Sequence, residues 1–376
     1  MRIIHFSDTH LGYRAYNRTE HGVNQRERDM LESFRRALSS MLEYDAEVVL
    51  HAGDFFDRVR PSNYTLRETL DIMNAFQKLR CERPFLIAAG NHECPRTADT
   101  ISPLALLRDV PGVVIAERGI VQYDHNGYHF TLVPDNPFLS DTLRSAVEPD
   151  PYARGNILVV HGALQAYLPN AVRKLPERML DTNRWNYIAL GDYHIATEVR
   201  PRCWYSGSLD YCSSDIWSES RSAAKRFLVI DTDDGYAVHT HCVQPSRVVY
   251  DLVIDAGAYS CLDCLHGAME RELVRAERDW IVRLVIENVP DDWYKTVLSP
   301  AIQALRSELF HCQVIVKRRR IATVSLGTGQ VNLPDLMDAW DQFANQFAVA
   351  HSLENSDRET LKQLGRDYLE RCDERV

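Results

Sequence analysis

The first twelve residues, Met1-Arg2-Ile3-Ile4-His5-Phe6-Ser7-Asp8-Thr9-His10-Leu11-Gly12, join a strand pattern to two candidate metal ligands. A short apolar run stops at Asp8 and His10, where a buried strand would end. Residues two apart in extended chain point the same way, so both side chains can reach one metal ion. Asp-x-His alone is common by chance. The motif is evidence for a metal site only if later strands also end in residues that can bind a metal.

Four later apolar runs also end in such residues. Gly53-Asp54 follows the run 46–52, and Gly90-Asn91-His92-Glu93 follows the run 84–89. His161-Gly162 follows the run 156–160, and Gly191-Asp192-Tyr193-His194 follows the run 187–190. Helix-like patterns over 25–43 and 63–79 separate the first three strands. This alternation predicts an α/β fold with helices on the faces of a sheet. Ligands in such sheets collect beyond the carboxyl ends of the strands, which is where these residues lie.

The candidate ligands together suit a site for two metal ions. They are Asp8, His10, Asp54, Asn91, His92, His161, Asp192 and His194. Oxygen and imidazole ligands fit manganese, iron or zinc. One carboxylate can bridge two ions, and such a pair activates water and neutralises phosphate charge. A single histidine is more often structural, but ligands at five strand ends predict a two-metal phosphoester hydrolase.

These motifs, in this order, resemble those of the calcineurin-like metallophosphoesterases. The opening Phe6-Ser7-Asp8-Thr9-His10-Leu11-Gly12-Tyr13, the segment Gly53-Asp54-Phe55-Phe56-Asp57 and the later Tyr205-Ser206-Gly207-Ser208-Leu209 are similar to the SbcD/Mre-eleven DNA repair nucleases. The resemblance covers about residues 1–245. It implies a four-layer β-sandwich flanked by helices, and a manganese-dependent exonuclease and endonuclease that works in DNA repair.

The resemblance also implies a role for each ligand. Asp8, His10, Asp54 and His194 would hold one ion, and Asp54, Asn91, His161 and Asp192 the other. His92 would be a catalytic histidine that orients phosphate or protonates the leaving oxygen. The family usually has histidine where this chain has Asp192. Compared with histidine, the aspartate adds a negative charge and removes a nitrogen ligand. We expect metal binding to be retained with an altered metal preference or rate.

The chain is expected to divide into three parts. Residues 1–245 form the nuclease domain. Residues 246–325 read as a small β-α-β-α-β unit, with a helix expected over 291–310, and match the family's DNA-capping domain by position and size. Residues 326–376 have a helical pattern, and the stretch from Leu336 to Phe347 is either a packed helix or a docking arm for an SbcC-type coiled-coil ATPase. No phosphate-binding Gly-x-x-x-x-Gly-Lys motif is present, so ATP dependence would come from that partner.

Other partner contacts are expected from local features. Arg14, Asn17 and Arg18 follow the first ligands, and Lys317, Arg318 and Arg319 form a basic run; each set is either a DNA-backbone contact or a solvated surface. The apolar positions of 63–79 and Leu104 to Leu107 are mostly core, but the resemblance implies that part of this region forms a homodimer interface. The net charge of −10 argues against DNA binding by bulk basicity.

Composition sets broader bounds. The 376 residues, 45% apolar and 26% charged, are typical of a globular protein of two or three domains. No apolar run long enough for a membrane span and no secretion signal is seen, so a cytoplasmic protein is expected. The nine cysteines then favour free thiols. Cys261-x-x-Cys264 with His266 leaves a zinc site open as the alternative.

Two other functions remain open. The first is a phosphatase or cyclic-nucleotide phosphodiesterase, which the same metal core would serve. The second is a non-enzymatic scaffold that binds DNA ends, with a metal site weakened by Asp192. Turnover of phosphomonoesters would favour the first, and a low metal content the second.

Overall fold

The computed structural model describes residues 1–319, apart from 96, 98, 99, 172 and 223, and a few positions between 340 and 366. The chain divides into two compact units, residues 1–319 and 320–376, and the elements below belong to the first. Most of the helical segment predicted over 326–376 lies outside the described residues, as do the last residues of the predicted capping domain. None of the described helices is long and apolar enough to cross a membrane.

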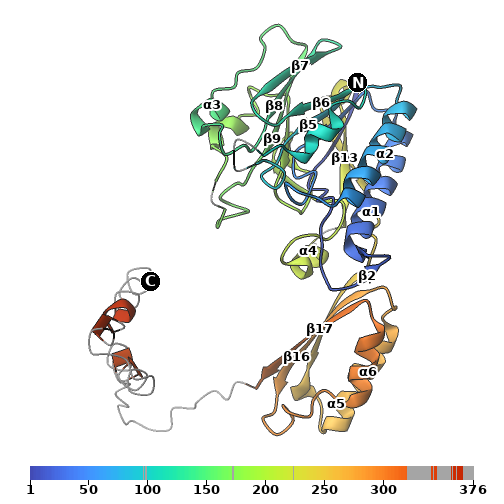
Figure 1. Ribbon diagram of the computed structural model, residues 1–376, viewed down its shortest axis with the longest axis vertical. Coiled ribbons are helices and arrows are strands. Elements are labelled where there is room, and N and C mark those ends of the chain that lie inside the picture. Colours follow the sequence, from blue (N-terminus) through green and yellow to red (C-terminus); the bar gives the residue numbers. More distant parts are fainter. Residues whose placement is uncertain are drawn as a thin grey trace. The chain divides into compact units, whose positions relative to one another are not determined.

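The first of two six-stranded sheets holds the N-terminal strand at its centre (Figure 1). Its order is β14 (Ala237–Cys242), β13 (Arg226–Asp231), β1 (Arg2–Phe6), β4 (Val48–His51), β5 (Phe85–Ala88) and β6 (Val113–Ala116). Strands β1, β4, β5 and β6 are parallel. The hairpin β13–β14 closes the sheet in the antiparallel sense.

The second sheet also has four parallel strands, but its antiparallel strands lie one at each edge. Its order is β11 (Thr197–Arg200), β12 (Cys203–Tyr205), β10 (Tyr187–Gly191), β9 (Gly155–His161), β8 (Tyr128–Val133) and β7 (Val121–His125). The four inner strands are parallel, and the two edge strands are antiparallel to their neighbours. Both sheets therefore present several strand carboxyl ends at one edge.

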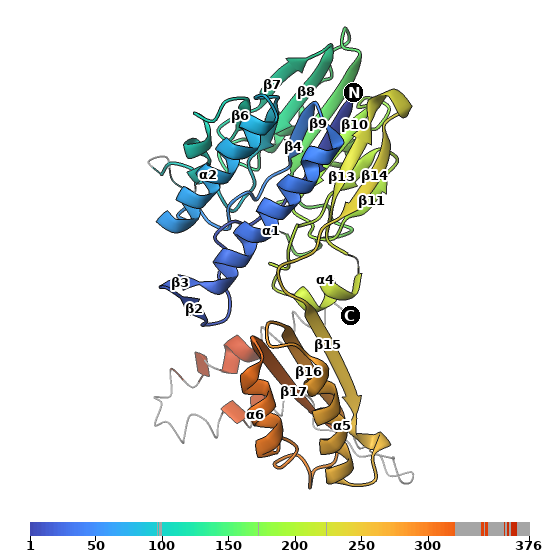
Figure 2. The same cartoon turned by 90° about the vertical axis from the view of Figure 1, so that its right-hand side faces the viewer.

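Helices α1 (Gln25–Met41) and α2 (Asn63–Leu79) cover the outer face of the first sheet (Figures 1 and 2). Each begins at a side-chain cap: Asn24 accepts from the N–H of Arg26, and Ser62 from that of Thr65. The predicted helix over 63–79 is confirmed at both ends, and the one over 25–43 ends at Met41, before a short helix η1 (Leu42–Tyr44).

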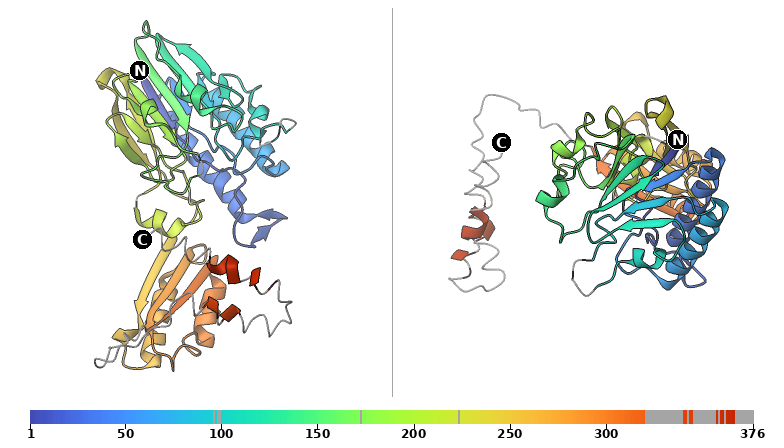
Figure 3. Two further views of the ribbon diagram at one scale, coloured as in Figure 1. Left: turned by 90° about the vertical axis from the view of Figure 1, so that its left-hand side faces the viewer. Right: turned by 90° about the horizontal axis from the view of Figure 1, so that it is seen from above.

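Three apolar layers hold these elements together. One lies between the helices and the first sheet and includes Phe34 and Met73. A second lies between the sheets, where Leu50 meets residues such as Phe130. The third covers the outer face of the second sheet with η3 (Glu177–Leu180) and Trp185, near the short α3 (Asp141–Ser145) (Figure 3). The predicted four-layer α/β sandwich is confirmed.

A smaller parallel sheet follows, with its own apolar core (Figure 2). Its strands are β15 (Val249–Asp255), β16 (Ile281–Val289) and β17 (His311–Arg318), with helices α5 (Leu262–Arg275) and α6 (Pro300–Glu308). The predicted β-α-β-α-β order is confirmed. The helix predicted over 291–310 is wrong in its first half: Ser299 caps the helix and Pro300 begins it, while residues 291–298 form turns.

Short elements complete the described unit. They are β2 (Thr19–Glu20), β3 (Val23–Asn24), η2 (Pro103–Leu107), α4 (Ile216–Ser222), η4 (Thr232–Asp234) and η5 (Ala256–Ala258).

A buried ion pair ties α1 to the segment that follows the second sheet. The Arg26 guanidinium donates to Asp210 at 3.0 Å, and both side chains are at most 1% exposed. Removing one partner of such a pair leaves an uncompensated buried charge. We predict that Arg26→Ala lowers the free energy of unfolding by about 3–5 kcal/mol.

Urea denaturation measures this loss, with Arg35→Ala as the control on the same helix. Arg35 forms exposed pairs with Glu32 and Glu68, so its substitution should cost less than about 1 kcal/mol. Equal effects of the two substitutions would contradict the assignment of Arg26–Asp210 as a structural pair.

Candidate metal centre

The predicted ligands follow five strands whose carboxyl ends converge. Asp8 and His10 follow β1, Asp54 follows β4, and Asn91 with His92 follows β5 of the first sheet. The second sheet contributes the remaining three: His161 ends β9, and Asp192 and His194 follow β10. The structure brings all eight into one connected group of side chains.

Glycines allow the strand ends of the two sheets to approach closely. A Cβ on Gly53 would lie 2.4 Å from Nδ1 of His161, and one on Gly191 would lie 2.0 Å from the carbonyl oxygen of Ala52. Both distances are far below a normal van der Waals contact, so any larger residue would push the sheets apart. Each glycine directly precedes a candidate ligand, Asp54 or Asp192.

Asp54 lies between two groups of ligands. Its Oδ2 is 3.6 Å from Nε2 of His10 on one side and 3.5 Å from Nε2 of His161 on the other. His10 Nε2 in turn lies 3.1 Å from Nε2 of His194. His161 Nε2 lies 3.0 Å from Oδ1 of Asn91. This central carboxylate occupies the position that a bridging ligand requires.

Nε2 of His161 and the amide oxygen of Asn91 face each other in a way that suits a shared cation better than a hydrogen bond. His161 donates from Nδ1 to the carbonyl of Ala52 at 2.8 Å, so its neutral form carries a lone pair on Nε2. That lone pair faces the amide oxygen of Asn91, which is also an acceptor. A hydrogen bond from the other ring nitrogen to a carbonyl oxygen orients a metal-binding imidazole in this way. The donor set therefore fits divalent metal ions.

Asp8 and Asp192 are linked at the interface between the sheets. The backbone N–H of Asp192 donates to both carboxylate oxygens of Asp8, at 3.0 and 3.2 Å. Asp8 also lies with Asp54 and His161 in a group whose ligand atoms are within 4.8 Å of one another. Asp192 Oδ1 is 3.8 Å from Nε2 of His161. A carboxylate at position 192 thus faces the group formed by Asp54, Asn91 and His161.

Four of the candidate ligands have left-handed backbone conformations. The φ angles are +53° at Asp8, +42° at His10, +53° at Asp54 and +109° at Asp192. Non-glycine residues rarely adopt such angles, and each one costs free energy. Their concentration at one site is typical of a functional centre whose geometry the surrounding fold imposes.

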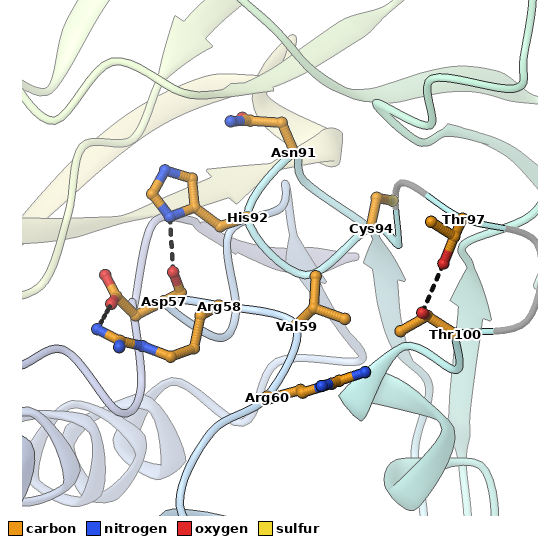
Figure 4. A pocket seen from close by; sticks show the side chains of 9 residues that line it. All are labelled: Asp57, Arg58, Val59, Arg60, Asn91, His92, Cys94, Thr97 and Thr100. Atoms are coloured by element: carbon orange, nitrogen blue, oxygen red, sulfur yellow. Dashed lines mark hydrogen bonds and ion pairs between the residues drawn. The ribbon is translucent and has the colours of Figure 1, made fainter.

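His92 lies at the edge of the group, beside open space. Its Nδ1 is 2.8 Å from the carbonyl oxygen of Asp57, and its Nε2 is 3.8 Å from Asp54 Oδ2. It lines a pocket of about 510 Å³ together with Arg58, Arg60 and others (Figure 4). It also lines a second pocket of about 500 Å³ that contains His10, Asp54 and His194. His92 is thus the candidate that reaches both the ligand group and the adjoining basic pocket.

The buried carboxylates attract protons to the imidazoles of the metal-free protein. Burial acts to lower the pKa of His10, but Asp57 and Asp54 outweigh it and raise the pKa to about 9. Burial likewise acts to lower the pKa of His161, but Asp54 and Asp192 outweigh it and raise the pKa to about 10. A site that stabilises protonated imidazoles this strongly has excess negative charge, which divalent cations would neutralise.

Two buried carboxyl groups nearby are held toward the neutral form. Burial raises the pKa of Asp8 to about 6. Burial and the Asp54 carboxylate raise the pKa of Glu93 to about 8. Glu93 Oε1 accepts from the backbone N–H groups of Gly90 and Phe55, which fixes the two loops that carry Asp54 and Asn91.

Three residues near His194 were not among the predicted site residues: Cys212, Glu219 and Lys225. Glu219 Oε1 lies 3.7 Å from His194 Nδ1 and forms a buried ion pair with Lys225. Its other contacts are Ser208 and Ser213. The Cys212 sulfur is also 3.7 Å from His194 Nδ1. No motif marks these residues, because Glu219 reaches the site from α4, outside the strand ends.

The predicted DNA-contacting side chains are engaged with neighbouring residues. Arg14 pairs with Glu27 at 2.9 Å, and Arg18 donates to the carbonyl of Leu309 at 2.5 Å. Asn17 and Arg18 line a pocket of about 500 Å³ that also includes Arg306 and His311.

The basic run at the end of β17 is exposed but partly paired. Lys317 lies 2.8 Å from Glu287, and the Arg318 guanidinium lies over the ring of Tyr294. The backbone N–H of Arg319 donates to Val289.

The sandwich fold and the ligand group define a metal-dependent phosphoesterase. The family model for calcineurin-like phosphoesterases matches residues 1–241, and the chain belongs to this family. The chain is 31% identical over 242 residues to the protein of Methanocaldococcus jannaschii named DNA double-strand break repair protein Mre11, covering 61% of this chain and 62% of that protein. Proteins of the same name from Thermoplasma acidophilum and Methanopyrus kandleri are 28% and 25% identical, covering 62% and 65% of this chain and 62% and 57% of theirs. The chain thus spans less than two thirds of the length of these relatives.

The pKa values predict how metal-free stability depends on pH. The raised pKa values of His10, His161 and Glu93 mean that these three groups bind more protons in the folded metal-free protein than in the unfolded chain. Burial lowers the pKa values of His5, His51 and His194, but above an ordinary histidine pKa of about 6.5 these three are mostly unprotonated in both states. Stability then falls as pH rises. The histidine contribution is complete below an ordinary histidine pKa of about 6.5 and is lost as pH rises through the folded values of about 9 and 10. We predict that the melting temperature in EDTA falls from pH 6.5 to 9.

Manganese should restore this stability, because it replaces the protons. The rise in melting temperature on adding manganese should therefore grow with pH, with apparent metal affinity increasing up to about tenfold per pH unit for each proton displaced. Thermal melts with and without manganese measure both effects. A metal-induced rise that is the same at pH 6.5 and pH 9 would contradict the assignment.

Glu219 should support metal binding through His194. Because Glu219 faces Nδ1, it favours the orientation in which Nε2 points at the ligand group. Loss of a carboxylate that orients a metal-binding imidazole weakens metal affinity by about 10–100-fold. We predict a weakening in this range for Glu219→Gln, measured by manganese titration.

Glu198→Gln is the matched control, because Glu198 is an exposed residue of β11. The melting temperature in EDTA checks that Glu219→Gln remains folded. An unchanged manganese affinity in folded Glu219→Gln would show that Glu219 does not position His194.

Proposed function

We propose that this chain is a two-metal phosphodiesterase that cleaves DNA, as an exonuclease on duplex ends and an endonuclease on single strands, in DNA repair. The observation that carries the proposal is the Asp54 carboxylate, which lies between the imidazoles of His10 and His161 beside the pocket lined by His92. The printed names of the relatives, DNA double-strand break repair proteins, support DNA as the substrate.

Two divalent ions, with manganese expected, would be held by the two ligand groups. Asp8, His10, Asp54 and His194 would hold one, and Asp54, Asn91, His161 and Asp192 the other. When bound, the ions supply an activated water and neutralise the charge of the phosphodiester. Asp192 provides a further anionic oxygen at the second position, which favours harder, oxygen-preferring ions there.

The chain's own residues then position the substrate. His92 faces the open pocket, where a ring N–H can donate to a phosphate oxygen or pass a proton to the leaving oxygen. Arg60 lines the same pocket and adds positive charge there, while Arg58 is paired with Asp57. Burial of Asp8 and Asp54 keeps bulk water away from the ligand oxygens.

The remaining parts of the chain are assigned roles in the complex. Residues 246–325 would form a DNA-capping domain, in which Lys317, Arg318 and Arg319, with Arg14, Asn17 and Arg18 of the nuclease domain, contact the DNA backbone. Residues 326–376 would dock an SbcC-type ATPase. Exposed apolar side chains near α2 and η2, including Leu79 and Leu106, would support a homodimer. A cytoplasmic location follows from this assignment.

The test is a nuclease assay on labelled duplex and single-stranded DNA with manganese or magnesium. We predict that His92→Ala lowers cleavage by about 10²–10⁴-fold, the usual contribution of a general acid or base, while manganese binding is retained. His239→Ala on the exposed edge strand β14 is the matched control and should cleave as the unmodified chain does.

Two results would replace this proposal. Rapid hydrolysis of phosphomonoesters or cyclic nucleotides without DNA cleavage would assign the site to a phosphatase or phosphodiesterase. Elemental analysis that finds fewer than one bound ion per chain after manganese supplementation, without DNA cleavage, would assign a scaffold that binds DNA ends.

A further inference from the structure

Two cysteines of the small α/β sheet lie together at the start of a helix. Cys261 is the residue that caps α5, and Cys264 lies in its first turn. Both are exposed, and their sulfur atoms are 2.7 Å apart. The pair belongs to the sheet β15–β17 and shares no residue with the ligand groups around Asp54.

The surroundings argue against the zinc site that the sequence left open. His266 does not join the cysteines: its Nε2 lies 3.2 Å from the carbonyl oxygen of Thr296 and 3.1 Å from that of Val297, so it donates to backbone. A structural zinc site needs four ligands. Among the described residues, no group of three or more metal-binding side chains includes either cysteine.

The two thiols have different surroundings, which suits thiol–disulfide exchange. The sulfur of Cys261 accepts a hydrogen bond from the backbone N–H of Cys264 at 3.3 Å, at the positive end of a 14-residue helix. The hydrogen bond between the two sulfur atoms and the one from the backbone N–H of Cys264 hold the pKa of Cys261 below the ordinary thiol value. The same thiol hydrogen bond raises the pKa of Cys264. Cys261 is therefore the nucleophile of the pair and Cys264 the resolving thiol.

We propose that Cys261 and Cys264 form a reversible dithiol–disulfide couple that exchanges with low-molecular-weight disulfides. The Cys261 thiolate attacks one sulfur of the small disulfide, forms a mixed disulfide and releases one small thiolate. Cys264 loses its proton to water and attacks the Cys261 sulfur, which forms the intramolecular bond and releases the second thiolate. The protein loses two electrons and two protons, and the small disulfide is reduced to two thiols.

Oxidised glutathione is the probe, applied to the full chain and followed by alkylation and peptide mass spectrometry. The expected product is a Cys261–Cys264 disulfide that dithiothreitol reverses, while the exposed Cys81 and Cys242 remain largely alkylatable. Cys264→Ser should instead trap glutathione on Cys261, at least about tenfold faster than on Cys81 or Cys242. Cys261→Ser should not form a mixed disulfide rapidly at Cys264.

Three results would overturn the proposal. In the first, Cys261 and Cys264 stay as alkylatable as Cys81 and Cys242. In the second, Cys264→Ser forms no preferential mixed disulfide on Cys261. In the third, the purified chain retains one zinc ion that blocks oxidation of both thiols, which would restore the metal site. Thermal melts of the two serine variants, with substitutions at exposed positions, confirm that each result reports on folded protein.

Discussion

The buried negative charge of Asp8 and Asp54 is the constraint on which the rest of the structure depends. Carboxylates at most 1% exposed are costly unless they are paired and hydrogen-bonded. Here the imidazoles of His10 and His161 and the N–H groups of His92 and Asp192 supply that compensation. These groups come from both sheets, so the compensation is complete only when the two sheets pack together. Divalent cations complete the same charge balance.

The geometry that satisfies this constraint is achieved against local backbone preference. Asp8, His10, Asp54 and Asp192 have positive φ angles that a free chain would avoid. Apolar packing on both sides of each sheet stabilises the strands from which these residues emerge. The strain is thus offset by the core, which holds the candidate ligand atoms in position. Preorganisation of this kind lowers the cost of binding a charged ligand.

Much of the fold and of the candidate site could be predicted from the sequence, because both follow from strand ends. Apolar runs ending in Asp, Asn or His pointed to the seven candidate metal ligands and to His92, and the structure brings these side chains together. The false helix over 291–298 shows the limit of periodicity: Ser299 and Pro300 start the helix later than the pattern suggests. Glu219 could not be found in this way, because its contact with His194 depends on how α4 packs. The partners of Arg14 and Lys317 depend equally on tertiary contacts.

Helix α4 contacts both the candidate ligand His194 and the small sheet. Glu219 faces His194, and two residues further along Arg221 pairs with Asp251 of β15 at 2.6 Å. Arg283 of β16 also pairs with Asp251 and lies over the ring of Trp217 in the same helix. Through Glu219, Arg221 and Trp217, this seven-residue helix thus contacts both His194 and the strands of the small sheet.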